Sequence, residues 1–516
     1  MKINNIFKVV AIGILALALG ACSDRLDIAQ HSVSPVNGYY HTDKEAEEGV
    51  VACYTGMRAL ETGMGSALQT VKELLSDNVW TGGGSHYDGS FYRLNDYTFS
   101  SDYSAFKTIY TNLYNLIYSC NTVLENVSEE SAIKKRARAE AQVFRAYANF
   151  QLVTLWGTAP LVTKTLSEGE YMQGNSTKEA LWNQVEKDLT EAIASGALTS
   201  KKNVNTATSR ITKEFAEALL GKAYLFQEKY AEAAKELDIV INSGLYALNP
   251  DLTYNGTPKG NNDQESIFEV NCLNDIQNRD PNNNFKWIMM GLRAEKYSYS
   301  SNSPLCKQSF GYLQPRKDLY DAFVKVEGVN GYRLNHTIVT LSQLNTIFGA
   351  KPAMEVTDNE GYFNYKYRIL QEYFSGYFYA NNSRIMKYNE VLLLSAEAHF
   401  KNGDQATAIK YINQIRDRAQ APEVTSLTMD DIKTESRLEL YLEGQRYENL
   451  IRWGDAAVAL EHNGEKNPAL QEDGTVKWTS YNKAGDCGFV KGRNELWPFP
   501  AEEINVNHNM KQNNGY

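Results

Sequence analysis

Residues 215–240 read FAEALLGKAYLFQEKYAEAAKELDIV. Small residues stand at Gly221 and Ala233, twelve positions apart, where two paired helices can approach each other closely. Apolar residues recur every three or four positions, which is the spacing of one half-buried helical face: Phe215, Leu219, Ala223, Phe226 and Tyr230. The stretch therefore predicts two helices packed against each other.

A second stretch repeats this spacing near residue 396. Ala396 and Ala408 are again twelve residues apart. The Leu-Gly-x-x-Tyr run at 220–224, followed by Ala233, is similar to the tetratricopeptide pattern, in which stacked helix pairs bury a shared core. Weaker helical stretches cover 104–127, 132–156 and 178–195. We expect an all-α fold with tetratricopeptide-like repeats that are not contiguous, so the chain is not a simple solenoid.

The first residues have the features of a secretory leader. Lys2 and Lys8 give a positive start, and an apolar run covers 9–21. This run is shorter than the ~20 residues of a membrane span. Its Leu-Gly-Ala-Cys ending resembles a bacterial lipobox, so we expect a signal peptide over 1–21 and a lipid on Cys22. We also expect a tether over 22–42 and a first helix with Asp43 as its N-cap.

Net charge and cysteine usage exclude several classes. The chain carries a net charge of −10, which argues against nucleic-acid binding because that rests on basic side chains that neutralise phosphates. Beyond Cys22, the cysteines are scattered without a Cys-x-x-Cys pair: Cys53, Cys120, Cys272, Cys306 and Cys487. Metal or redox use needs clustered ligands, so we expect buried thiols, with one disulfide as the alternative.

No local signature of an enzyme is present. The sequence has no Gly-x-Ser-x-Gly elbow, no His-Glu-x-x-His and no phosphate loop, since Gly82–Gly84 is not followed by Lys-Ser/Thr. The Asp280–Asn284 segment begins like a calcium loop but lacks its glycine and closing glutamate. We therefore predict no catalytic residues, no metal and no cofactor. A glycosidase, which needs only two carboxylates, stays open.

Four motifs in a fixed order carry a family resemblance. The first runs over 138–161 and starts RAEAQVFRAY; the second, over 390–419, contains EVLLLSAEA and NQIRDRA. The third, over 435–454, contains RLELYLEGQR and ends RWG, and the tail from Leu496 begins LWPFP. Together they resemble the SusD/RagB lipoproteins from Cys22 to the last residue. Lys387 stands where the family commonly has Arg, and Asn449 where it commonly has Asp.

The resemblance implies a lipoprotein of the outer membrane that faces the cell exterior. Such a protein captures a nutrient, usually a glycan, and docks on a SusC-like TonB-dependent transporter. Asp24 and Asp27 are similar to the acidic tether of surface-exposed members. The resemblance further implies one SusD-like domain over 43–516. Its parts are a helical core (43–250 and 381–460), a loop-rich ligand-binding region (about 250–380) and a family tail (461–516).

Aromatic side chains beside short polar ones mark the candidate ligand site. Aromatic planes cover the apolar faces of a sugar, and amides and carboxylates bind its hydroxyls. The loop 77–102 offers Asp77, Asn78, Trp80, His86, Tyr87 and Tyr92, beside Asp88 and Arg93. The region 274–312 offers Trp287, Tyr297 and Tyr299, beside Asn278, Arg279 and Asn284. Trp80 and Trp287 are the first choices, and core packing is the alternative for each.

Other charged and aromatic stretches receive structural interpretations. Arg437, Glu439, Glu443, Arg446 and Arg452 are expected to form structural ion pairs. The aromatic run 362–379 suggests a packed strand or a transporter contact. The functional alternatives are a peptide-capturing member of the same family, a surface glycoside hydrolase or peptidase, and a scaffold that binds only its transporter.

Overall fold

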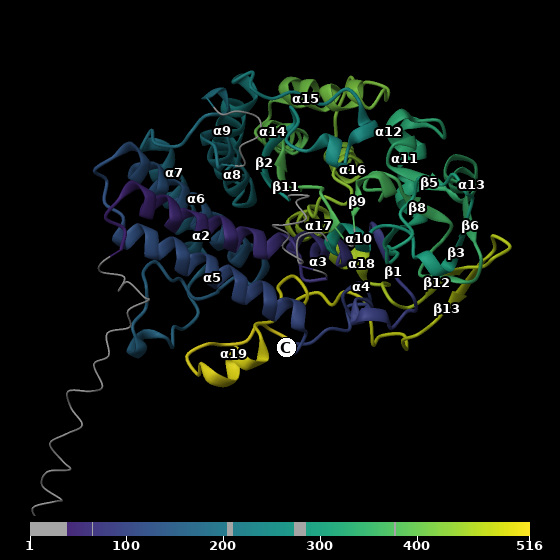
Figure 1. The fold of residues 1–516 in the computed structure, drawn as a ribbon, viewed down its shortest axis with the longest axis horizontal. Helices are drawn as coiled ribbons and strands as arrows, with labels where there is room; N and C mark the ends of the chain where they lie inside the picture. Colours follow the sequence, from purple (N-terminus) through teal and green to yellow (C-terminus); the bar gives the residue numbers. More distant parts are fainter. Residues whose placement is uncertain (1–38, 64, 204–209, 273–284, 376–377) are drawn as a thin grey trace, which may run out of the picture.

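The computed structural model describes residues 39–63, 65–203, 210–272, 285–375 and 378–516. The predicted leader, Cys22 and the tether as far as residue 38 lie outside the described residues, as do Asn278, Arg279 and the Asp280–Asn284 segment. Helices dominate the regular structure of the described part, and its strands are short (Figure 1). None of its helices is long and apolar enough to cross a membrane.

The N-terminal half of the core is a layer of long helices at the left of Figure 1. They are α2 (Asp43–Glu61), α5 (Ser104–Asn126), α6 (Ala132–Leu155) and α7 (Lys178–Ala194). In the chain, the short helices α3 (Leu68–Leu74) and α4 (Tyr92–Asn95) come after α2 and before α5. The predicted cap of α2 is wrong by one residue. Thr42 is the N-cap, because its hydroxyl accepts from the Glu45 N–H while the Glu45 carboxylate accepts from the Thr42 N–H.

The two predicted helix pairs are present. The first is α8 (Lys213–Phe226) with α9 (Tyr230–Asn242), and the second is α14 (Tyr388–Lys401) with α15 (Gln405–Arg418). A Cβ on Gly221 would lie 2.6 Å from the Leu237 side chain, so only glycine allows this approach of α8 and α9. α14 packs against α9, which brings the two pairs together although they are far apart in sequence. The predicted all-α, tetratricopeptide-like core is confirmed.

Shorter helices complete the chain. They are α10 (Phe285–Met289), α11 (Lys317–Glu327), α12 (Tyr332–Asn335), α13 (Leu341–Phe348), α16 (Met429–Glu439), α17 (Arg446–Trp453), α18 (Ala456–Leu460) and α19 (Ala501–Val506). The first four lie inside the region predicted to be loop-rich. In Figure 1 that region forms the right side of the molecule, next to the helical core.

The strands pair in small antiparallel sheets. The pairs are β1 (Val79–Gly82) with β4 (Tyr312–Pro315), β2 (Ser266–Val270) with β11 (Ser383–Lys387), β3 (Tyr297–Tyr299) with β6 (Ala350–Pro352), β5 (Ile338–Thr340) with β8 (Tyr362–Asn364), and β9 (Phe374–Ser375) with β10 (Phe378–Tyr379). One three-stranded sheet contains β7 (Val356–Thr357), β12 (Asn467–Leu470) and β13 (Val476–Thr479). This sheet brings the C-terminal tail against the loop-rich region.

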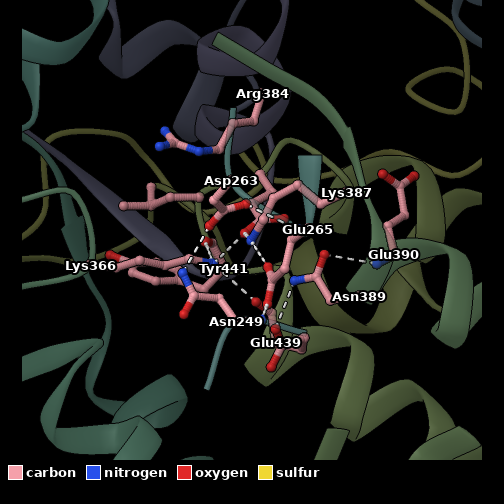
Figure 2. A network of polar contacts seen from close by, with 12 residues as sticks. Asn249, Asp263, Glu265, Lys366, Arg384, Lys387, Asn389, Glu390, Glu439 and Tyr441 are labelled. Carbon is pink, nitrogen blue, oxygen red and sulfur yellow. Dashed lines mark hydrogen bonds and ion pairs between the residues drawn. The ribbon is translucent and has the colours of Figure 1, made fainter. Parts of the chain in front are cut away.

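A buried network of charged side chains joins these parts (Figure 2). Glu265 pairs with Lys387 at 2.8 Å and with Arg418 at 2.6 Å, while Glu439 pairs with Arg418 and Arg333. Burial raises the pKa of Glu439, but the neighbouring cations outweigh burial and hold that pKa well below its usual range. Removing one partner of such a pair leaves an uncompensated charge, so the network fixes how the helices and strands meet.

The five cysteines in the described residues are buried, as predicted. Cys53 on α2 and Cys120 on α5 face each other with their sulfur atoms 3.7 Å apart.

Candidate functional site

Three tyrosine rings contact one another where the turn after β1 meets the segment after β13, and the exposed Trp478 on β13 stands three residues before one of them in the chain. We call Tyr87, Tyr92, Trp478 and Tyr481 the aromatic surface. Tyr87 is 59% exposed and Trp478 48% exposed. The Tyr87 ring lies edge-on to Tyr92 at 5.1 Å and to Tyr481 at 5.7 Å. Rings held against one another in this way present faces to solvent at little cost in conformational entropy.

His86 lies beneath these rings and is 2% exposed. Its imidazole is parallel to the Tyr481 ring, with centroids 3.8 Å apart. Its Nε2 lies 3.2 Å from an Asp96 carboxylate oxygen and its Nδ1 lies 3.4 Å from one of Asp358. Burial lowers the pKa of His86, but the two aspartates outweigh burial and raise it to about 9. His86 was predicted to contact ligand, and the structure places it as a support for Tyr481.

Trp80 lies under Trp478 rather than in solvent. It is 7% exposed, and its ring meets Trp478 edge-on at 5.9 Å. The Arg316 guanidinium stands 4.0 Å from the Trp80 ring centroid, and the Trp80 N–H donates to Glu360 at 2.7 Å. Trp80 therefore fixes the position of the more exposed Trp478.

Polar groups flank the aromatic surface. Asp88, next to Tyr87, pairs with Arg293 at 2.7 Å and accepts from the Gly84 N–H at 2.9 Å. Both charged side chains remain partly exposed. On the other side, the Asn482 amide donates to Asp96 at 2.8 Å, which anchors the segment that carries Tyr481. Hydroxyl-binding groups thus lie beside the rings.

Asp77 and Asn78 were predicted to bind ligand, but the structure buries both. Arg446 binds the two Asp77 carboxylate oxygens at 2.7 and 2.8 Å, and Arg437 donates to Asn78 Oδ1 at 2.8 Å. Burial raises the pKa of Asp77, but Arg446 and Arg437 outweigh burial and hold it below its usual range. These residues anchor the start of the 77–102 segment to α16 and α17.

Trp287 was predicted to contact ligand, with core packing as the alternative, and the structure shows core packing. Trp287 is 1% exposed, lies on the Tyr367 ring at 4.7 Å and donates its N–H to the Asn381 carbonyl at 2.8 Å. Tyr297 is buried in a second apolar cluster, while Tyr299 is half-buried with Lys307 5.4 Å from its ring centroid. The 274–312 region contributes Arg293 to the site, but Trp287 belongs to the core.

Trp478 and Tyr481 were missed in the sequence. Asp473 and Gly474 form the tip of the β12–β13 hairpin, where the Gln471 N–H donates to the Thr475 carbonyl at 2.8 Å. A Gly-containing turn followed by alternation is a hairpin signal, and it would have placed Trp478 on a strand. Whether that residue faces solvent depends on β7, from a distant part of the chain.

The arrangement can bind and orient a flat, hydroxyl-rich ligand. Within the described ranges, no group of three or more His, Cys, Asp or Glu side chains could hold a metal ion. His86 and its two aspartates are buried under Tyr481, so they are not presented to a ligand.

Comparison with known proteins links both halves of the chain to one family. Residues 253–516 match the model of the SusD family, and residues 33–225 match a model described as starch-binding associating with outer membrane. A SusD-like protein of Formosa agariphila is 22% identical over all of both chains. The starch-binding protein SusD of Bacteroides thetaiotaomicron is 34% identical over 128 residues, which are 25% of this chain and 20% of that protein.

Solved structures agree on the fold. A laminarin-binding SusD-like protein superposes with a TM-score of 0.76 at 26% identity, covering 92% of this chain and 99% of that one. Surface glycan-binding protein A from Bacteroides thetaiotaomicron, in complex with laminarihexaose, gives a TM-score of 0.73 at 22% identity, with 92% of this chain and 99% of that one covered. The helical core and the loop-rich region together therefore follow the SusD-like fold.

Proposed function

The chain belongs to the SusD/RagB family, and on that premise we propose that it captures a glycan at the cell surface and delivers it to a SusC-like TonB-dependent transporter. The aromatic surface is the site of capture. The main support for the proposal is the way this surface is built. Tyr87 and Trp478 are exposed, while the buried His86 packs against Tyr481 and the buried Trp80 packs against Trp478.

A glycan suits this surface better than a small buried ligand does. Tyr and Trp rings stack on the C–H faces of sugar rings, and Asp88 and Arg293 lie beside them to bind hydroxyls. A polymer can extend across an open surface from one ring to the next. The names of two relatives, one laminarin-binding and one starch-binding, support a polysaccharide of glucose as the first ligand class to test.

We infer the location of the protein from the leader and the family. Lipid on Cys22 would anchor the chain to the outer membrane, and residues 22–42 would let the domain over 43–516 stand away from the membrane. The description of the N-terminal family model, starch-binding associating with outer membrane, supports this placement. The helical core is the part that would dock on the transporter.

A binding screen tests the proposal. The purified protein is titrated with laminarin, starch, mucin glycans and a peptide library, and the release of reducing ends is measured in parallel. We expect saturable binding of at least one glycan without release of product. Binding of peptides alone would favour the peptide-capturing alternative. Cleavage of a polymer would favour a glycoside hydrolase, and the absence of all binding would favour a scaffold.

A further inference from the structure

A hollow of about 220 Å³ lies between α5, the segment 160–173 and α19. It is separate from the aromatic surface: α5 and α19 lie at the lower left of Figure 1, whereas β13 lies at its right edge. The side chains that matter in its lining are Tyr110, Tyr114, Asn115, Tyr171 and Glu503. None of the four residues of the aromatic surface lines this hollow.

Two tyrosines build the floor of the hollow. The Tyr110 and Tyr114 rings, one turn apart on α5, lie 4.8 Å from each other. The Tyr114 hydroxyl donates to the Pro160 carbonyl at 2.7 Å, which fixes the segment 160–173 to α5. Tyr110 is buried against Trp156 and Phe499, so the floor is part of the core.

The opposite wall is fixed by amide side chains that follow α19. The Asn507 amide donates to the Gln173 carbonyl and the Asn509 amide to the Met172 carbonyl, both at 2.7 Å. These bonds hold Tyr171 and the residues after it next to Glu503. A hollow whose walls are hydrogen-bonded to each other needs little reordering when a ligand enters.

Three polar groups of the lining have no hydrogen-bond partner within the described part of the chain. They are the Asn115 amide, the Tyr171 hydroxyl and the Glu503 carboxylate. The exposed Tyr171 ring supplies an apolar face beside them. Among the described residues that line the hollow, Glu503 alone is charged, which disfavours anionic ligands such as phosphates or sulfated sugars.

We propose that this hollow is a second carbohydrate site that takes one neutral sugar ring. The Tyr171 ring covers a C–H face, while Glu503 accepts from two neighbouring hydroxyls and Asn115 donates to a third oxygen. The volume is below that of pockets for drug-sized ligands, about 300–1,000 Å³, so it fits one ring rather than a chain. This site does not depend on the aromatic surface for its geometry.

Titration with D-glucose, D-galactose and D-mannose, followed by calorimetry at millimolar sugar, tests the site. Glu503→Gln and Tyr171→Ala each remove one contact, and Tyr118→Ala serves as the control because Tyr118 is exposed on α5 outside both the hollow and the aromatic surface. We expect the parent and Tyr118→Ala to bind at least one hexose with equal affinity. Glu503→Gln is expected to bind it about tenfold more weakly, because a hydrogen bond to a charged group is lost.

Three results would overturn this second site. They are the absence of binding for all three hexoses, unchanged affinity in both hollow variants, and binding of lysine methyl ester at the hollow in place of hexoses. Failure of the proposed glycan capture would give a different pattern. Tyr87→Ala would then leave polysaccharide binding intact, while Glu503→Gln would still bind the hexose more weakly than the parent.

Discussion

The imidazole of His86 lies parallel to the phenol ring of Tyr481, with 3.8 Å between the ring centroids and an angle of 4°. His86 follows β1 and Tyr481 follows β13, so this contact joins two parts of the chain that are far apart in sequence. The buried ring thereby sets the position of a half-buried one. We therefore expect binding at the aromatic surface to depend on residues that are buried beneath it.

Tyr87→Ala should weaken glycan binding by about 1–3 kcal/mol, which is the range for truncating an aromatic anchor. Tyr118→Ala is the matched control, because Tyr118 on α5 is equally exposed, at 59%, but lies outside the aromatic surface. Affinity electrophoresis against the glycan found in the screen measures both. Equal loss in the two variants would exclude Tyr87 as a specific contact.

His86 should make the free energy of unfolding decrease as the pH becomes alkaline. Its pKa is raised to about 9 in the folded chain, above the ordinary value near 6.5 of an unfolded histidine. The stabilisation is therefore complete below about pH 6.5 and is lost as the pH rises through about 9. The free energy of unfolding of the parent, measured by urea titration between pH 6 and 10, should fall more steeply than that of His86→Gln. Parallel curves for the two proteins would contradict this role.

Trp287→Ala should destabilise the fold by about 3–5 kcal/mol, since it empties a buried site beside Tyr367. Thermal unfolding measures the loss. Trp478→Ala, at a half-exposed position, should lower the unfolding temperature much less. A Trp287 variant as stable as the parent would show that the residue does not belong to the core.

Asp77→Asn should destabilise the chain by about 3–5 kcal/mol, because it leaves the Arg446 guanidinium without its carboxylate partner in a buried position. A double-mutant cycle with Arg446→Met separates this pair from other effects of the substitutions. If the two single substitutions add without coupling, the ion pair does not anchor the 77–102 segment.

The helical core could be predicted because its signal is local. The spacing around Gly221 and Ala233 indicates a helix pair without reference to the rest of the chain. Both predicted pairs are present. The ion pairs of Arg437, Glu439, Glu443, Arg446 and Arg452 could be predicted as a class. Their partners could not, because Asp77 and Glu397 come from distant parts of the chain.

The candidate site could be predicted only in part for the same reason. Tyr87 and Tyr92 stand in a polar, Gly-containing segment that indicates a surface turn. Asp77 and Trp287 have similar neighbours in sequence, yet Arg446 and Tyr367 bury them. Trp478 lies at the surface because β12 and β13 extend the sheet that contains β7. The sequence of a single strand does not show which other elements pack against that strand.

The most direct test of the account is calorimetric titration of the Trp478→Ala/Tyr481→Ala double variant with the glycan that the parent binds. Because the two rings are the part of the aromatic surface that the C-terminal tail supplies, we expect no saturable binding and an unfolding temperature close to that of the parent. Binding within about twofold of the parent, in a double variant that remains folded, would contradict the claim that this surface captures the ligand.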